Sequence, residues 1–210
     1  MEVMYSDNIN NLFKDSLITG VYGDKIDLIN LGVNLNGIVY DDEWTVKRFL
    51  NGLKFKIDEN ILTLFTELEI SYSLLKYKIK DLSKCHFKLI LLCYMILNRK
   101  ELLILDYFDK GLSYKYKKRV INYLKSKYED KVVVISNDLV FLDRLCSKLI
   151  VFEKGNIVFN DNMAYIYKSR VKIEYPEIIK FIRLANKKKA KLNYTVETHE
   201  LLKDIYRSVR

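Results

Sequence analysis

The segment from Gly20 to Asp27, GVYGDKID, is a candidate for binding phosphate groups. A phosphate-binding loop has the pattern G-x-x-x-x-G-K-S/T, because glycines let backbone N–H groups close around the phosphates, the lysine reaches the outer phosphates and the hydroxyl holds magnesium. The segment keeps Gly20, Gly23 and Lys25, but it is one residue short or lacks the second glycine of the pattern. Asp27 would also place a negative charge where phosphate charge should sit. We therefore interpret the segment as the remnant of a phosphate loop.

A second candidate is a carboxylate at the end of a strand. Residues 102–105, LLIL, form a continuous apolar run, which is the pattern of a strand buried in a parallel sheet. Asp106 follows this run, so the strand delivers an acid to the carboxyl edge of the sheet. The next residue is Tyr107, a neutral phenol with an unperturbed pKa of about 10, which cannot serve as a general base at pH 7. Asp109 is a further acid, but its position two residues on gives no reason to expect its carboxylate at the same spot.

Three further pieces stand in a fixed order around Asp106. Upstream, Leu82 to His86 reads LSKCH, and the run from Phe87 to Leu97 after it is apolar nearly all round, as in a buried helix. Downstream, the β-branched residues Val132 to Ser136 are followed by Asn137, Asp and Leu. In this order and at this spacing the pieces resemble the ATP-binding subunit of an ABC transporter, in which a signature loop, a helix, the Walker B strand and a switch histidine follow one another.

The resemblance implies specific roles at the strand ends. Asp106 corresponds to the Walker B aspartate, which holds magnesium through water. Tyr107 takes the place of the glutamate that polarises the attacking water, and Asp109 is the one nearby acid that could stand in for it. Asn137 takes the place of the histidine that contacts the outer phosphate, and asparagine can form a hydrogen bond but cannot carry a proton.

The signature and the glutamine-containing loop of the family are also altered. Ser83 is retained, whereas Lys84 and Cys85 replace glycines whose backbone approaches phosphate closely. Lys84 could instead offer a cation to the phosphate. Asp41, in IVYDDEWTV, replaces the glutamine and cannot supply the donor of an amide. The residues that the resemblance and the loop pattern together place at nucleotide are Gly20, Gly23, Lys25, Asp41, Ser83, Lys84 and Asn137.

The elements that position these residues follow from apolar spacing. We expect a strand at Ser16 to Thr19 with a turn at Gly20 to Gly23, and a hairpin at Lys148 to Asn160 with its turn at Lys154 to Asn156. Between Val46 and Lys80 the three- and four-residue spacing predicts two amphipathic helices, which match the helical subdomain of the family. The predicted core-facing residues of these helices are Val46, Phe49, Leu50, Leu53, Ile61, Leu62, Leu64, Phe65 and Leu68. Trp44 is expected to pack beneath its loop.

The last part of the chain predicts two helices. Pro176 opens the first of them, and the second runs from about Glu197 to Tyr206 with Thr195 as its N-cap. The phrase YPEIIKFIRLANKKKAKLNYTVETHELLKDI is similar to the C-terminal extension of energy-coupling-factor ATPases, which helps to pair two ATPase subunits. We therefore expect an ABC ATPase-like domain at 1–163, with a helical subdomain at about 46–97, and a C-terminal helical extension at 164–210.

The composition sets limits on location and partners. The formal net charge is +9, but the chain is rich in Lys, Asn, Ile and Tyr, so we attribute the charge to a general bias and expect no nucleic-acid partner. The lysine clusters at 115–119 and 187–191 are expected to be solvated helix faces. No apolar run of about eighteen residues occurs and the start is polar, which predicts a cytoplasmic protein. Cys85, Cys93 and Cys146 lack the spacing of a zinc site or a disulfide framework.

These observations predict an α/β fold of the P-loop NTPase type, with a parallel sheet, a helical subdomain and a reduced N-terminal β part. The predicted function is that of a degenerate ABC-type subunit with impaired or absent ATP hydrolysis. It would pair with an active ATPase subunit and dock on a transmembrane subunit at the inner face of the membrane, with ATP and magnesium as the implied ligands. Two alternatives stay open. One is a slow ATPase in which Lys25, Asp106 and Asp109 suffice, and the other is a scaffold, regulatory or DNA-associated protein with the same fold.

Overall fold

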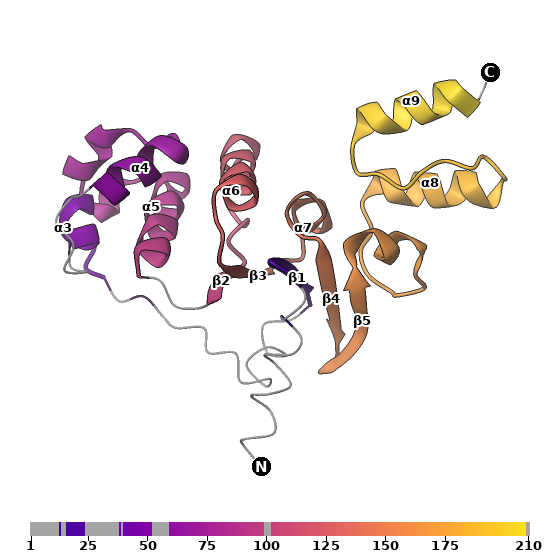
Figure 1. Cartoon of the computed structure of the whole chain (residues 1–210), viewed down its shortest axis with the longest axis horizontal. Helices are drawn as coiled ribbons and strands as arrows, with labels where there is room; N and C mark the ends of the chain where they lie inside the picture. Colours follow the sequence, from indigo (N-terminus) through magenta and orange to yellow (C-terminus); the bar gives the residue numbers. More distant parts are fainter. Residues whose placement is uncertain are drawn as a thin grey trace, which may run out of the picture.

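The described part of the chain forms a mixed α/β domain with a five-stranded sheet (Figure 1). The computed structural model describes residues 13, 16–23, 38, 40–51, 59–98 and 102–208. The strands are β1 (Ile18–Tyr22), β2 (Leu102–Asp106), β3 (Lys131–Ile135), β4 (Lys148–Glu153) and β5 (Asn156–Asn162). The α-helices are α3 (Val46–Asn51), α4 (Glu59–Glu67), α5 (Lys84–Leu97), α6 (Tyr114–Ser126), α7 (Leu139–Leu145), α8 (Glu177–Lys187) and α9 (Thr198–Ser208). Short 3-10 helices lie at Tyr72–Lys76, Ile79–Asp81 and Met163–Lys168.

The strand order is β2-β3-β1-β4-β5, and all pairs except β4 with β5 are parallel. Strand β1 lies between β3 and β4, so the segment that follows β1 begins near the middle of the sheet. The predicted hairpin is confirmed, because β4 and β5 are joined by a turn with positive φ at Lys154 and Gly155. The predicted parallel sheet is therefore confirmed, with one antiparallel strand at its edge.

Both faces of the central sheet are covered by apolar side chains. Successive residues of β3 alternate between two clusters, with Val132 and Val134 in the larger one and Val133 and Ile135 in the smaller one. Burial on both faces explains why these strands are nearly continuous apolar runs rather than alternating ones. Helices α6 and α7 lie over the same face of the sheet, and α5 lies beside α6 (Figure 1).

The helical part before β2 contains the two helices that the apolar pattern predicts, α3 and α4. Helix α3 has only six residues, and α4 is followed by 3-10 turns. The prediction for Leu62 is wrong, because its side chain is 39% exposed, and Leu53 lies outside the described residues. The other predicted core positions of these two helices are buried: Val46, Phe49, Leu50, Ile61, Leu64, Phe65 and Leu68. Trp44 packs against this core, as predicted.

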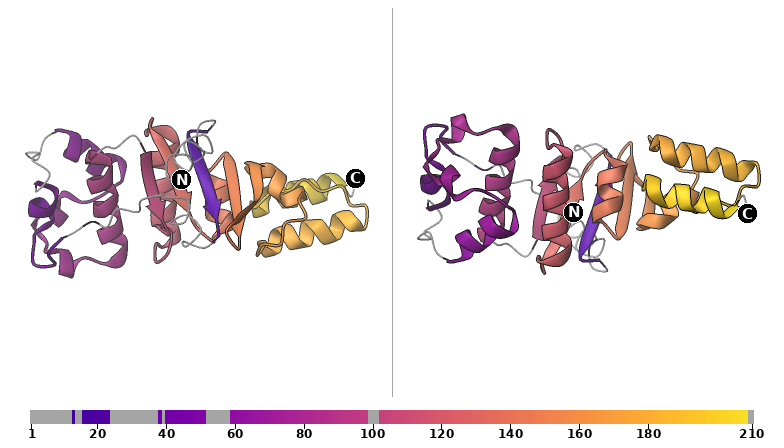
Figure 2. Two further views of the ribbon diagram at one scale, coloured as in Figure 1. Left: turned by 90° about the horizontal axis from the view of Figure 1, so that it is seen from below. Right: turned by 90° about the horizontal axis from the view of Figure 1, so that it is seen from above.

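The C-terminal helices α8 and α9 lie side by side at the end of the molecule opposite to the helical part (Figure 2). Pro176 precedes α8, as predicted. The predicted final helix is confirmed, since α9 begins at Thr198, but the prediction of Thr195 as its N-cap is wrong because Thr195 lies three residues before the helix. The Thr195 hydroxyl instead accepts a hydrogen bond from the Glu197 amide at 3.0 Å, which makes a local turn before the helix.

Candidate functional site

The candidate site lies at the carboxyl ends of the three adjacent parallel strands β2, β3 and β1. Their register places Asp106 beside Ile135, and Ile135 beside Val21. Backbone hydrogen bonds continue one step beyond, because the Tyr107 amide donates to the Ile135 carbonyl at 2.9 Å. The carboxyl ends of adjacent parallel strands form the crevice where α/β sheets bind ligands. The sheet therefore brings the predicted strand-end residues together, although Gly23 is more than 80 residues away from both Tyr107 and Asn137 in the chain.

Tyr107 and Asn137 both bind the main chain of Gly23. The Tyr107 hydroxyl donates to the Gly23 carbonyl at 2.7 Å, and the Gly23 amide donates to Oδ1 of Asn137 at 3.3 Å. The polar groups of one residue at the end of β1 are thus bound by side chains from the ends of β2 and β3. The Tyr107 ring is held from the other side by the Lys110 ammonium, 3.8 Å from the ring centroid.

The two predicted loop glycines have different surroundings. The predicted turn at Gly20 is wrong, because Gly20 lies inside β1, where an added Cβ would be 3.1 Å from the Cys146 sulfur. Gly23 follows the strand with φ +139°, and a Cβ there would be 2.9 Å from the Phe152 carbonyl oxygen. Gly20 is therefore explained by packing against α7, and Gly23 by both backbone conformation and close approach. Lys25 lies outside the described residues.

Asp106 ends β2 with its side chain half-buried at the same edge. Among the described residues there is no group of three or more His, Cys, Asp or Glu side chains that could hold a metal ion. Magnesium in nucleotide sites commonly uses only one or two carboxylates together with phosphate oxygens. The donor set fits magnesium only in that mode, with Asp106 as the protein carboxylate.

Asp109 is buried and lies beside Lys117. Its side chain is only 7% exposed, and Oδ2 lies 3.9 Å from the Lys117 ammonium. Lys117 also donates to Asp138 at 2.6 Å, and Asp138 caps α7 by accepting from the Phe141 amide at 3.0 Å. Burial opposes ionisation of Asp138, but the hydrogen bonds from Lys117 and Phe141 outweigh it and lower the pKa of this carboxyl. The two carboxylates and Lys117 thus tie α6 to the turns after β2 and β3.

Lys88 is a residue of this region that the sequence analysis missed. Its ammonium donates to the Tyr107 carbonyl at 3.2 Å and to the Phe108 carbonyl at 2.8 Å. Partial burial lowers the pKa of Lys88, although the charge of Asp109 opposes this shift. A lysine inside the apolar run FKLILLCYMIL was the available signal, because a cation among core residues needs polar partners. Lys88 fixes the turn that carries Tyr107.

The signature-like residues LSKCH form the start of α5. The Ser83 hydroxyl accepts from the His86 amide at 3.2 Å, which makes Ser83 the N-cap of the helix. The Cys85 thiol contacts the Gly111 carbonyl at 3.4 Å, and Nε2 of His86 lies 2.9 Å from the Tyr116 hydroxyl. Lys84 is exposed. The structure places Ser83 and Lys84 at the start of α5, and within the described residues no hydrogen bond joins them to Gly23, Tyr107 or Asn137.

Asp41 also has a local role in the structure. Its Oδ1 accepts from the Glu43 amide at 2.9 Å in an exposed turn. Glu43 itself binds Lys78 at 2.9 Å and Lys80 at a shorter distance, and these hydrogen bonds lower the pKa of Glu43 to about 2. The loop that carries Asp41 is thus attached to the 3-10 turns before α5, which the sequence did not reveal.

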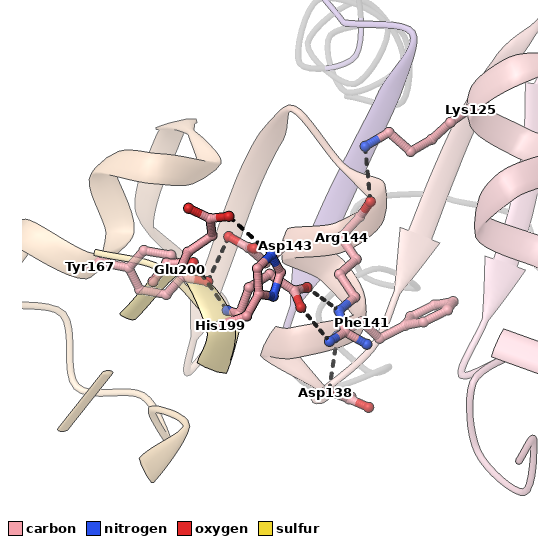
Figure 3. A network of polar contacts seen from close by, with 10 residues as sticks. Lys125, Asp138, Phe141, Asp143, Arg144, Tyr167, His199 and Glu200 are labelled. Atoms are coloured by element: carbon pink, nitrogen blue, oxygen red, sulfur yellow. Dashed lines mark hydrogen bonds and ion pairs between the residues drawn. The ribbon is translucent and has the colours of Figure 1, made fainter. Parts of the chain in front are cut away.

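A polar network attaches the C-terminal part to α7 (Figure 3). The Arg144 guanidinium binds both carboxylate oxygens of Glu197, at 2.8 and 3.2 Å, and the Tyr167 hydroxyl donates to Asp143 at 2.7 Å. Burial raises the pKa of Asp143, and burial together with Asp143 raises the pKa of Tyr167. Bidentate pairs of this kind fix orientation as well as distance. The helices α8 and α9 are therefore held to the sheet domain by specific contacts.

Comparisons with known proteins agree with this architecture. No known family profile matches the chain, and no curated protein matches it in sequence. Among solved structures, a metal-chelate type ABC transporter in an inward-facing conformation is similar with a TM-score of 0.54 at 14% identity, over 70% of this chain and 72% of that one. The RNase-L Inhibitor is similar with a TM-score of 0.53 at 17% identity, over 72% of this chain but 36% of that one.

These similarities concern the fold, because the sequence identities are low. Within the described residues no helix is long and apolar enough to cross a membrane. The strand order, the strand-edge residues and the structural neighbours agree with one another. The chain therefore has the P-loop NTPase-like fold found in ABC ATPases.

Proposed function

We propose that this chain is an ABC-type ATP-binding subunit of a membrane transporter that does not hydrolyse ATP itself. It pairs with an active ATPase subunit and docks on a transmembrane subunit at the cytoplasmic face. The observation that carries the proposal is the pair of hydrogen bonds at Gly23, whose carbonyl accepts from the Tyr107 hydroxyl and whose amide donates to Asn137. The side chains at the two positions expected to activate water and contact the outer phosphate bind the protein's own backbone instead.

The chemistry of these two side chains also argues against hydrolysis. A positioned general base contributes about 10² to 10⁴ to a rate, and Tyr107 is a phenol whose hydroxyl is used as a donor to Gly23. Asp109 is no substitute, because its carboxylate is buried toward Lys117. Asn137 cannot exchange a proton at neutral pH. The slow-ATPase alternative therefore has no base in position among the described residues.

Nucleotide binding is a separate part of the proposal. Magnesium would neutralise phosphate charge, and Asp106 is the carboxylate that would hold it. Gly23 would have to offer its amide to phosphate in place of Asn137, since one N–H cannot serve both acceptors fully. We therefore expect weak nucleotide binding at this edge. Ser83 and Lys84, at the start of α5, would face the nucleotide of the paired subunit.

Pairing is supported by apolar side chains on the C-terminal helices. Helix α8 exposes Phe181 and Leu184, and α9 exposes Leu202 and Tyr206, with exposed fractions between 49% and 74%. Neighbouring exposed apolar groups on adjacent helices are typical of interaction sites. We assign the helical extension at 164–210 to subunit pairing and the domain at 1–163 to the nucleotide site, with the resemblance to energy-coupling-factor ATPases as the reason.

The test measures nucleotide binding and hydrolysis in the same preparation. A fluorescent ATP analogue is titrated with and without magnesium, and phosphate release is followed for the native chain and for Asp106→Asn. Asp161→Asn, an exposed change on β5, is the matched control. We expect magnesium-dependent binding that Asp106→Asn weakens, and equal background phosphate release from all three proteins. Hydrolysis by the native chain above the Asp106→Asn variant would contradict the proposal, and so would an absence of binding at millimolar nucleotide.

A further inference from the structure

A groove of about 790 Å³ lies between helices α6 and α7, on the helix side of the sheet. Its apolar floor comes from both helices and from the loop before α6: Leu112, Ile121, Val140 and Phe141. Glu197, just before α9, closes one side. The volume is in the range of known ligand-binding clefts, but the groove is bordered by helices rather than enclosed. Its shape therefore suits a segment of chain lying along α6.

The walls of the groove carry an excess of positive charge. Four cations line it, Lys117, Lys118, Lys125 and Arg144, against two carboxylates, Asp138 and Glu197. The carboxylates are already paired with Lys117 and Arg144.

The two remaining lysines have no carboxylate partner within the described part of the chain. Lys118 is exposed, and Lys125 donates to the carbonyl of Arg144 at 3.1 Å and is only near, not paired with, the Asp143 carboxyl. They stand seven residues apart, with Asn122 between them, on one face of α6. The groove thus offers two cations in a row beside an apolar floor.

We propose that this groove binds an acidic, apolar segment of a partner protein. Apolar side chains of the segment would cover Ile121 and Val140, and its carboxylates would meet Lys118 and Lys125. Tyr114 adds an anchor at one end, because its ring is 66% exposed and the Arg144 guanidinium lies 5.4 Å from its centroid. Exposed aromatic rings held beside arginine are typical of the central residues of protein interfaces.

The same observations argue against nucleic acid as the occupant. A phosphate backbone gains affinity from each cation that it neutralises, and only two of the lining cations lie outside the ion pairs of the groove. Asp138 and Glu197 would also face that backbone, and the apolar floor would stay uncovered. An acidic, apolar protein segment would contact both the two lysines and the apolar floor. Helix α6 has 13 residues and spans about 20 Å, which corresponds to a helical segment of about 13 residues.

The test uses defined probes and fluorescence anisotropy. The probe is a labelled amphipathic peptide of about 14 residues, with leucines on one face and glutamates on the other. The comparison probes are the same peptide with lysines in place of glutamates, and a labelled single-stranded oligonucleotide of about 12 nucleotides. No nucleotide is present, and none of the contacts that carry the inference involves Gly23 or Tyr107. The result is therefore independent of the proposed ATP chemistry.

The variants distinguish binding in the groove from nonspecific attraction to the positive charge of the chain. Lys118→Glu with Lys125→Glu reverses the groove lysines, whereas Lys168→Glu with Lys172→Glu makes the same net change at exposed lysines outside the groove. Ile121→Ser tests the apolar floor. All three are checked for native circular dichroism before use.

We expect micromolar binding of the acidic peptide, weakened about tenfold or more by the groove variant and by Ile121→Ser but not by the control variant. Equal weakening by both charge variants would overturn the inference, because general attraction would then explain the binding. The inference would also be overturned by an absence of saturable binding at millimolar peptide. Tighter binding of the oligonucleotide, lost in the groove variant, would assign the groove to nucleic acid instead.

Discussion

Tyr107→Phe removes one atom from the strand-edge site and leaves the rest of the ring in place. The lost oxygen is the donor to the Gly23 carbonyl at 2.7 Å. A buried acceptor left without a partner costs about 1–3 kcal/mol. Because Gly23 is half-buried and water can replace the phenol in part, we expect the lower end, about 1 kcal/mol. For a chain of this size that corresponds to a fall in Tm of about 2–4 °C.

The assay is thermal unfolding together with amide hydrogen exchange at the ends of β1 and β3. Tyr165→Phe is the matched control, since Tyr165 is 55% exposed and makes no hydrogen bond through its hydroxyl to any residue that the structure describes. The exchange of amides near Gly23 should quicken in Tyr107→Phe and stay unchanged in Tyr165→Phe. Equal melting temperatures and equal exchange in the two variants would refute the reasoning, because the phenol would then contribute nothing at Gly23.

Three further expectations concern other parts of the molecule. Gly23→Ala should lower stability by more than about 1 kcal/mol in chemical denaturation, because a Cβ would be strained at φ +139° and would meet the Phe152 carbonyl at 2.9 Å, whereas tolerance of alanine would contradict this geometry. Ser83→Ala should cost about 1 kcal/mol in the same assay through loss of the α5 N-cap, with Ser83→Asn restoring most of it. The folded-state pKa of Asp138 is lowered, so its stabilisation is present above the unfolded-state pKa of about 4 and is lost as pH falls below it. Asp138→Asn should therefore flatten the dependence of Tm on pH between about 5 and 2, and an unchanged slope would exclude this carboxyl as a cause.

Much of the fold was predictable because local runs of apolar residues mark its strands. The run before Asp106 and the run at 131–135 are continuous and apolar, which is the composition of strands covered on both faces. The hairpin after Lys148 and the helix after Pro176 follow from turn residues that restrict the backbone. Where the sequence pattern was weak, the predicted boundaries of the elements differ from those in the structure. Gly20 was predicted to lie in a turn but lies in β1, where the glycine leaves room for Cys146, the residue just after α7.

The sequence allowed the residue types at the site to be predicted, but not the hydrogen bonds that these residues form. The resemblance predicted that Tyr107 and Asn137 take the places of a general base and of a histidine that can carry a proton. It did not show that both bind Gly23, because that depends on three strands from distant parts of the chain ending at one level. The side-chain contacts of the basic cluster at 115–119 were also not predictable from the sequence. Arg119 and Lys117 were expected to be solvated, but Arg119 binds Glu69 and Lys117 binds Asp138.

The sequence by itself determined the apolar composition of the strands, the acid at the end of β2 and the residue types at the strand ends, among them Tyr107 and Asn137. These are properties of residue type and near spacing, which local sterics and apolar periodicity convert into structure. Only the tertiary structure decided which polar groups became partners. Hydrogen bonds and ion pairs join atoms a few ångströms apart, and the folded sheet, not distance along the chain, brings Tyr107 and Asn137 to Gly23 and Lys118 and Lys125 to the edge of an apolar groove.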